Sequence, residues 1–152
     1  MKHIMSVFVI LALSAGFARA QSVTVQGAEI LDYGLYAVDP AALGSPHLTA
    51  TTHAVPLRPG VMFGFQYRVT GAPAGGQVQI KEVVLFPPGG LRLPGKPPIP
   101  LESDEATVKI GDTLPLTWKF DNPWELVPGL WTLQVWSGDR KLVEQSFTAT
   151  AQ

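Results

Sequence analysis

The sequence predicts an all-β protein, and three observations lead to that prediction. First, 15 glycines and 14 prolines are spread along the 152 residues, so they divide the chain into short segments. Second, several of these segments alternate apolar and polar residues with the period of two that is typical of half-buried strands. Third, no segment after residue 20 carries the apolar stripe of a long amphipathic helix. Short strands joined by turns are typical of sandwiches and barrels.

Residues 61–70 and 113–120 show the alternation most clearly. Every second residue is apolar and shares one face of its strand: Val61, Phe63, Phe65, Tyr67, Val69, Leu114, Leu116, Trp118 and Phe120. Pro115 lies on the opposite face of the second strand. Because proline cannot donate a hydrogen bond to a neighbouring strand, Pro115 favours an edge position for 113–120.

A hairpin is predicted to close the chain. The alternation around Trp131 puts this side chain in the core and Trp136 on the opposite face. The dipeptide Gly-Asp at 138–139 predicts a two-residue turn, since such turns need the positive φ that glycine adopts easily. The last strand then returns with Phe147 in the core.

Earlier parts of the chain supply further strands. In residues 22–38 the alternation changes parity next to Gly27, which predicts a β-bulge. Residues 47–55 have a β-rich composition and are predicted to form one strand. Residues 77–86 form another, and their continuous apolar end at 83–86 predicts either a strand covered on both faces or a further bulge.

Residues 87–100 contain six prolines and three glycines, so they cannot form a helix or a central strand. They predict a long extended connection with polyproline character, which could cross from one sheet to the other. Residues 102–105 are expected to be a short acidic and exposed piece, followed by a short strand at 107–110.

Together these segments give about seven or eight strands. They predict a single domain over residues 21–152, built as an antiparallel two-sheet sandwich of immunoglobulin-like or related topology, with a small barrel as the alternative. The chain has no cysteine, so this architecture is expected without the disulfide of antibody domains.

The first twenty residues are predicted to be a signal peptide. Lys2 and His3 precede an apolar run at 4–13, and Ala-Arg-Ala at 18–20 has the form of a cleavage site. The apolar run is about half as long as a membrane span. We therefore expect an exported protein that is not inserted in the membrane after cleavage. The expected location is periplasmic, with secretion as the alternative.

Charge and motifs exclude several classes of function. Cleavage would remove two of the 11 basic residues and none of the 12 acidic ones, which leaves a net charge of −3. Without a basic cluster, nucleic acid is a poor candidate partner. The sequence has no cysteine nucleophile, no G-x-S-x-G segment and no glycine-rich phosphate loop. Acidic pairs such as Asp121 and Glu125 lie in turns. We therefore predict no enzymatic activity and no cofactor.

Two tryptophans are the candidate binding residues. Trp124 lies beside acidic residues in a predicted turn, and Trp136 faces away from the core, so each could belong to an exposed aromatic patch. The patch at Trp136 could include Tyr33 or Tyr36. It could equally be covered by the proline-rich segment 87–100.

No metal site is predicted, and the weak alternative uses His47 and His53. On one regular strand these two side chains would face the same side but lie about 20 Å apart, too far to share an ion. A bend between them would be needed to bring them together.

Three segments of the chain resemble a known family: YGLY at 33–36, MFGFQY at 62–67 and WELVPGLWT at 124–132. They are similar to a bacterial family of small exported proteins that is described only as a domain of unknown function. The resemblance implies an immunoglobulin-like sandwich, export and a single-domain chain, and it implies no catalytic residues.

The leading functional hypothesis is a non-enzymatic binding or interaction module of the cell envelope, with a protein or envelope component as its partner. One alternative is a carbohydrate-binding module that uses Trp124 and Trp136. Another is a periplasmic copper-handling protein that uses His47 and His53.

Overall fold

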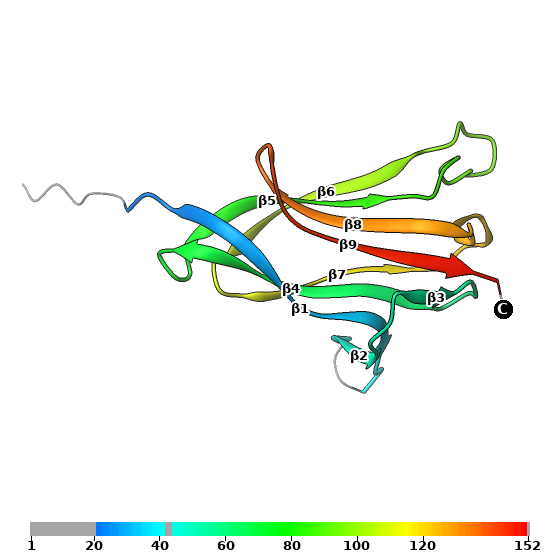
Figure 1. Ribbon diagram of the computed structural model, residues 1–152, viewed down its shortest axis with the longest axis horizontal. Helices are drawn as coiled ribbons and strands as arrows, with labels where there is room; N and C mark the ends of the chain where they lie inside the picture. The colour runs from blue at the N-terminus through cyan, green and yellow to red at the C-terminus, as the bar shows by residue number, and fades with distance from the viewer. Residues whose placement is uncertain (1–20, 42–43, 152) are drawn as a thin grey trace, which may run out of the picture.

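A computed structural model describes residues 21–41 and 44–151, and these residues form two packed β-sheets (Figure 1). Sheet A has the strand order β2-β1-β4-β7, and sheet B has the order β3-β9-β8-β5-β6. In chain order the elements are β1 (Thr24–Val38), β2 (Pro46–Ala50), β3 (Ala54–Pro56), β4 (Met62–Ala72), β5 (Gln77–Leu85), β6 (Leu101–Lys109), β7 (Thr113–Lys119), the 3₁₀ helix η1 (Pro123–Glu125), β8 (Gly129–Ser137) and β9 (Arg140–Thr150). The predicted signal peptide lies outside the described residues.

The predicted antiparallel sandwich is confirmed. Within the described residues every strand pair is antiparallel except β3 with β9, which run parallel. Strand β7 is an edge of sheet A, as Pro115 predicted, and Gly138 and Asp139 form the tight turn between β8 and β9. The described part has nine strands instead of seven or eight because one predicted strand is divided.

The divided strand is residues 47–55, where the prediction of one strand is wrong. Its first half, β2, pairs with β1 in sheet A, and its second half, β3, pairs with β9 in sheet B. The chain turns between them, where the backbone N–H of Ala54 donates to the hydroxyl of Thr52 at 3.0 Å. Both halves have β-rich composition, so composition alone could not reveal the crossing between the sheets.

The proline-rich segment 87–100 does not cross between the sheets. It is the long loop of a hairpin, because β5 and β6 are neighbours in sheet B. Leu91 and Ile99 form an isolated bridge within the loop. The segment 102–105 is exposed, as predicted, but it belongs to a strand: β6 pairs with β5 in continuous register from Leu85–Leu101 onwards.

The β-bulge predicted at Gly27 is confirmed by a register shift between Val25 and Gly27 in the pairing of β1 with β4. A second shift near residue 31 was not predicted. The guanidinium of Arg140 donates to the backbone oxygens of Val25 at 2.7 Å and Gln26 at 3.0 Å. This contact ties the bulge to the turn between β8 and β9, which comes from the other sheet.

The core lies between the sheets and contains most of the residues that the alternation predicted. The fully enclosed large side chains come from β3, β4, β8, β9 and the residue directly after β7: Val55, Phe63, Phe65, Tyr67, Val69, Phe120, Trp131, Leu133, Val135 and Phe147. Val61, Leu114 and Trp118 are only partly buried and pack against this core. No helix in the described part of the chain is long and apolar enough to cross a membrane.

Candidate binding site on the outer face of sheet B

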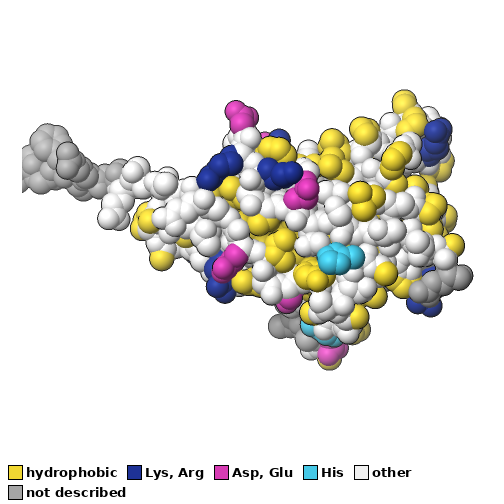
Figure 2. All heavy atoms as spheres, in the orientation of Figure 1, with side chains coloured by type: hydrophobic (Ala, Val, Ile, Leu, Met, Phe, Trp, Pro, Cys, Tyr) yellow, Lys and Arg dark blue, Asp and Glu magenta, His cyan; other side chains and the backbone are white. Residues whose placement is uncertain are grey.

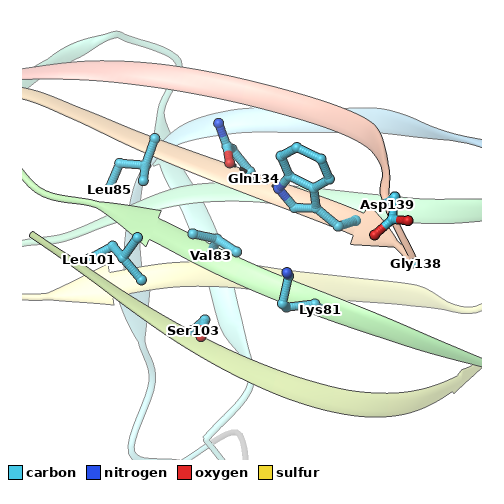
Figure 3. Close-up of a pocket in the computed structure, with 9 residues that line it drawn as sticks. Lys81, Val83, Leu85, Leu101, Ser103, Gln134, Gly138 and Asp139 are labelled. Atoms are coloured by element: carbon cyan, nitrogen blue, oxygen red, sulfur yellow. Dashed lines mark hydrogen bonds between the residues drawn. The ribbon is translucent and has the colours of Figure 1, made fainter.

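The outer face of sheet B carries a shallow hollow of about 320 Å³. Because side chains alternate along a strand, the residues of β5, β6 and β8 that do not face the core gather there (Figure 3). They include Lys81, Val83 and Leu85 from β5, Leu101 and Ser103 from β6, and Gln134 and Trp136 from β8.

Strand register brings these side chains together. Leu85 pairs with Leu101, Val83 with Gln134, and Lys81 with Trp136. Val83 is only 6% exposed although it faces outward, so neighbouring side chains cover it. The apolar run at 83–86 is therefore explained by burial on both faces, and the alternative of a bulge is wrong because the pairing of β5 is regular.

Trp136 is held in place by a chain of hydrogen bonds across β8 and β9. Its indole N–H donates to Gln134 Oε1 at 2.9 Å, and Gln134 Nε2 donates to Glu144 Oε2 at 2.6 Å. Lys141 Nζ also donates to Glu144 Oε2, at 2.7 Å. The bonds from Lys141 and then from Gln134 lower the pKa of Glu144, so this carboxylate stays an acceptor at neutral pH.

A cation also restrains the indole. Lys81 Nζ lies over the ring of Trp136, 5.8 Å from its centroid. Such a cation–π contact is worth about 0.5–1 kcal/mol at a surface site. With its edge hydrogen-bonded and one face under an ammonium group, Trp136 is half-buried and oriented before any ligand arrives.

The structure does not place Trp124 in the same site as Trp136. Trp124 is half-buried in η1 and lines a separate hollow with Pro88, Gly89 and Arg92 of the proline-rich loop. Trp136 lies near the other end of β8, roughly 23 Å along the strand from Gly129. The two tryptophans therefore do not form a single patch.

Neither tyrosine considered for the patch lines the hollow at Trp136. Tyr36 is buried in sheet A, where its hydroxyl bonds Asp32. Tyr33 stacks on His53 with ring centroids 4.5 Å apart. The proline-rich segment 87–100 does not line the hollow either, so it leaves Trp136 uncovered.

The two histidines lie in different segments, and each is beside β1: His47 pairs with Ala37, and His53 stacks on Tyr33. His47 is exposed in β2, and His53 lies just before β3 against Tyr33. Within residues 21–41 and 44–151, no three His, Cys, Asp or Glu side chains are grouped so that they could hold a metal ion.

The acidic pair at the predicted turn has a local structural role. Glu125 Oε2 accepts the backbone N–H groups of Asp121 at 2.7 Å and Asn122 at 2.6 Å, which caps η1. Asp121 forms an ion pair with Lys119 at 2.8 Å.

Sequence reasoning missed a second, acidic hollow of about 160 Å³ on the inner side of β6, towards β7. Glu82, Glu102 and Asp104 line it, and strand register places Glu82 opposite Asp104. The hydroxyl of Tyr67 donates to Glu82 Oε1 at 2.6 Å. The sequence did hold a signal, since Glu82 has the same parity as the core residue Ile80.

Glu82→Gln is expected to reduce the pH dependence of stability. Burial, followed by the charge of Asp104, raises the pKa of Glu82 above its ordinary value of 4.5, while the Tyr67 hydroxyl opposes the shift. The folded state therefore binds more protons than the unfolded state just above pH 4.5, and the wild type loses stability as the pH rises through that window. Glutamine keeps an acceptor for Tyr67 without the charge.

We expect the Glu82→Gln variant to be more stable than the wild type at pH 7, and the difference to shrink as the pH falls towards 4.5. Urea unfolding at a series of pH values measures both effects. Glu105→Gln, on the exposed outer face of β6, is the matched control and should show little change. A stability difference that is constant with pH would contradict the prediction.

Charged side chains of both signs are interspersed on the face of the molecule shown in Figure 2, and most of them lie towards the end where β1 begins. Hydrophobic side chains are spread over the middle and the opposite end of that face. This face therefore presents no continuous basic patch of the kind that nucleic-acid-binding proteins use.

The fold is similar to that of an immunoglobulin-like protein from Pseudomonas aeruginosa, with a TM-score of 0.67 and 27% identity over 85% of this chain and 97% of that protein. The immunoglobulin-like class is thereby confirmed. Beta-glucosidases from Erythrobacter marinus and Kluyveromyces marxianus align over 81% and 84% of this chain, at 12% and 15% identity and TM-scores of 0.36 and 0.39. The chain spans only 16% and 14% of those enzymes, so they carry no argument about function. No functionally curated protein matches the sequence.

A family model matches residues 25–149, which run from the start of β1 almost to the end of β9. The match includes both sheets and both hollows beside β6. The resemblance of the sequence to a family without an assigned activity is therefore confirmed: the chain belongs to the family described as domain of unknown function DUF3859.

Proposed function

We propose that this protein is a non-enzymatic binding module of the cell envelope, and that the hollow on the outer face of sheet B receives its partner. The observation that carries the proposal is the fixed orientation of Trp136 beside apolar side chains that remain open to solvent, such as Leu101 at 42% exposed. Aromatic residues held in place at the centre of a partly apolar surface are typical binding hot spots.

The proposed location depends on the first twenty residues. Their charged start, apolar run and Ala-Arg-Ala end are typical of a signal peptide, which supports export to the periplasm, with secretion as the alternative. Fractionation of cells that express the full-length chain tests this part separately from the binding site.

A protein partner is favoured over a carbohydrate by the position of Lys81. A sugar ring binds by stacking on an open aromatic face, and the ammonium group of Lys81 already lies over one face of Trp136. The apolar surface of Leu85 and Leu101 beside the indole suits a hydrophobic side chain of a protein. A carbohydrate-binding module remains the second candidate because the hollow contains a half-buried tryptophan.

A photo-reactive amino acid at Leu101 is expected to crosslink a protein partner in living cells. Leu31, in β1 of sheet A, is the matched control because it is 41% exposed against 42% for Leu101. We expect crosslinked species from position 101 and none from position 31. Trp136→Ala should reduce the yield of crosslinks from position 101 at least about tenfold, which corresponds to 1.4 kcal/mol. Trp136→Phe should restore part of the crosslink yield.

Equal crosslinking from the two leucine positions would contradict the proposed site. A change in tryptophan fluorescence on adding soluble peptidoglycan fragments, lost in Trp136→Ala and retained in Trp124→Ala, would instead support the carbohydrate-binding candidate.

A further inference from the structure

Strand β6 is an open edge of sheet B with a hollow on each of its faces. It lies last in the strand order of the sheet and pairs only with β5 (Figure 1). The apolar hollow at Trp136 includes Leu101 and Ser103 of this strand, and the acidic hollow includes Glu102, Ser103 and Asp104. One short stretch of β6 therefore borders two surfaces of different chemistry.

Among the described edge strands, β6 is the one best able to accept a further strand. It has nine residues and no proline. The other edges are shorter, and each contains a proline: Pro46 in β2, Pro56 in β3 and Pro115 in β7. Proline and short length are common ways to block pairing at an edge, and β6 has neither.

The backbone groups of β6 that point away from β5 can be identified. The N–H of Phe86 donates to the oxygen of Pro100, and the N–H of Ile110 donates to the oxygen of Gly76, both at 2.9 Å. Because hydrogen-bonded pairs alternate along an antiparallel ladder, even-numbered residues of β6 bond to β5 and odd-numbered ones point outward. In agreement, the N–H of Glu105 bonds the side chain of Asp104 at 3.0 Å instead of β5.

We infer that β6 adds an extended segment of a partner protein as a sixth strand of sheet B, and that this segment alternates basic and apolar side chains. This inference rests on the proposed function and specifies its partner. Side chains on one face of an added strand would lie beside Glu102 and Asp104, and those on the other would lie beside Leu101 and Ser103. The small side chain of Ser103 leaves room for a long apolar one to reach the hollow.

The acidic side chains beside the edge of β6 favour basic side chains on one face of the partner strand. None of Glu82, Glu102 and Asp104 forms an ion pair with any residue that the structure describes. Opposite charges on adjacent strands contribute about 0.2–1 kcal/mol per pair, and like charges oppose pairing. A second copy of this chain would bring its own Glu102, Asp104 and Glu105 against the same three residues, so self-pairing of β6 is disfavoured.

The test uses the mature protein and two synthetic peptides of identical composition. In acetyl-Lys-Thr-Lys-Leu-Lys-Thr-Lys-amide the lysines alternate with uncharged residues, so that the one apolar side chain, Leu, lies on the face opposite the lysines; in acetyl-Lys-Lys-Thr-Leu-Thr-Lys-Lys-amide lysines lie on both faces. We expect the alternating peptide to bind about tenfold more tightly at low salt, equivalent to 1.4 kcal/mol. Its binding should shift and protect the backbone N–H signals of Ser103, Glu105 and Thr107 in NMR spectra.

Two kinds of variant test the backbone edge of β6 and its acidic side chains separately. Ser103→Pro removes an outward N–H without removing a bond to β5, so it should abolish peptide binding and leave the N–H signals of β8 unchanged. Thr107 has the same parity as Ser103, so Thr107→Pro is used instead if the Ser103→Pro variant does not fold. Glu102→Gln with Asp104→Asn should weaken the alternating peptide and reduce the salt dependence of its binding.

Three results would overturn the inference: equal affinity of the two peptides, no binding at about 1 mM peptide, or concentration-dependent dimers that Ser103→Pro abolishes, which would make a second copy the occupant. If crosslinks from position 101 still depend on Trp136 but are insensitive to Ser103→Pro, the strand-addition inference fails while the proposed function stands. Loss of the dependence on Trp136 would count against the proposed function instead.

Discussion

Replacing Trp131 with alanine is expected to lower the free energy of unfolding by about 3–5 kcal/mol. Trp131 is fully buried, and its ring contacts four other aromatic rings with centroids 5.2–5.8 Å away: Phe63, Phe86, Trp118 and Phe120. Its indole N–H donates to the backbone oxygen of Val127 at 3.1 Å. Alanine would leave a cavity between the sheets and an acceptor without its donor.

Urea or guanidinium unfolding of the mature protein measures this loss. Leu130→Ala is the matched control because Leu130 is the preceding residue of β8, is 53% exposed and points the other way. It should change stability by no more than about 0.5 kcal/mol. A Trp131→Ala variant within about 1 kcal/mol of the wild type would show that the aromatic cluster does not hold the sheets together.

The core was predictable from the sequence because it depends on a local pattern. Alternation placed Phe63 and Trp131 between the sheets, and Phe147, predicted on the apolar side of the last strand, lies directly opposite Trp131 in β9. The bulge at Gly27 followed from the same pattern, since an inserted residue changes the parity of every residue after it.

The path of the chain between strands was harder to predict because it depends on distant partners. Residues 47–55 are β-rich on both sides of the crossing, and only pairing with β1 and β9 separates β2 from β3. The predicted crossing of the proline-rich segment 87–100 from one sheet to the other was wrong for a related reason. Prolines exclude a central strand, but they do not show whether the chain returns to the same sheet.

The candidate site was predicted in part. Trp136 was identified from its parity, which is a property of one strand. Its neighbours were not, because the hollow combines β5, β6 and β8 through a register that no single segment encodes. Trp124 was grouped with Trp136 because each could belong to an exposed aromatic patch, and the structure places them in separate hollows. Composition indicates which side chains can bind, and topology decides which of them meet.

Gly64→Ala is expected to destabilise the fold more than a change of the same type at an exposed glycine. Gly64 is buried in β4 with φ at +154°, and it lies between Gly34 of β1 and Thr117 of β7. A β-carbon at Gly64 would overlap the backbone oxygen of Leu116. Alanine would therefore add an unfavourable φ and also force the edge strand β7 away from β4, which breaks the ladder between these two strands of sheet A.

Gly60→Ala separates these two costs. Gly60 also has a positive φ, at +83°, but nothing lies within 4 Å of the position of a β-carbon there. The Gly60→Ala substitution should lower the free energy of unfolding only by the strain of a left-handed residue, about 1–2 kcal/mol. Gly64→Ala should exceed this by about 1–3 kcal/mol, the usual cost of overpacking a well-filled interior. If chemical unfolding shows equal losses of stability for Gly60→Ala and Gly64→Ala, β7 moves away from β4 without a measurable cost. A larger loss at Gly64 would show that glycine in MFGFQY is required by the close approach of β4 and β7.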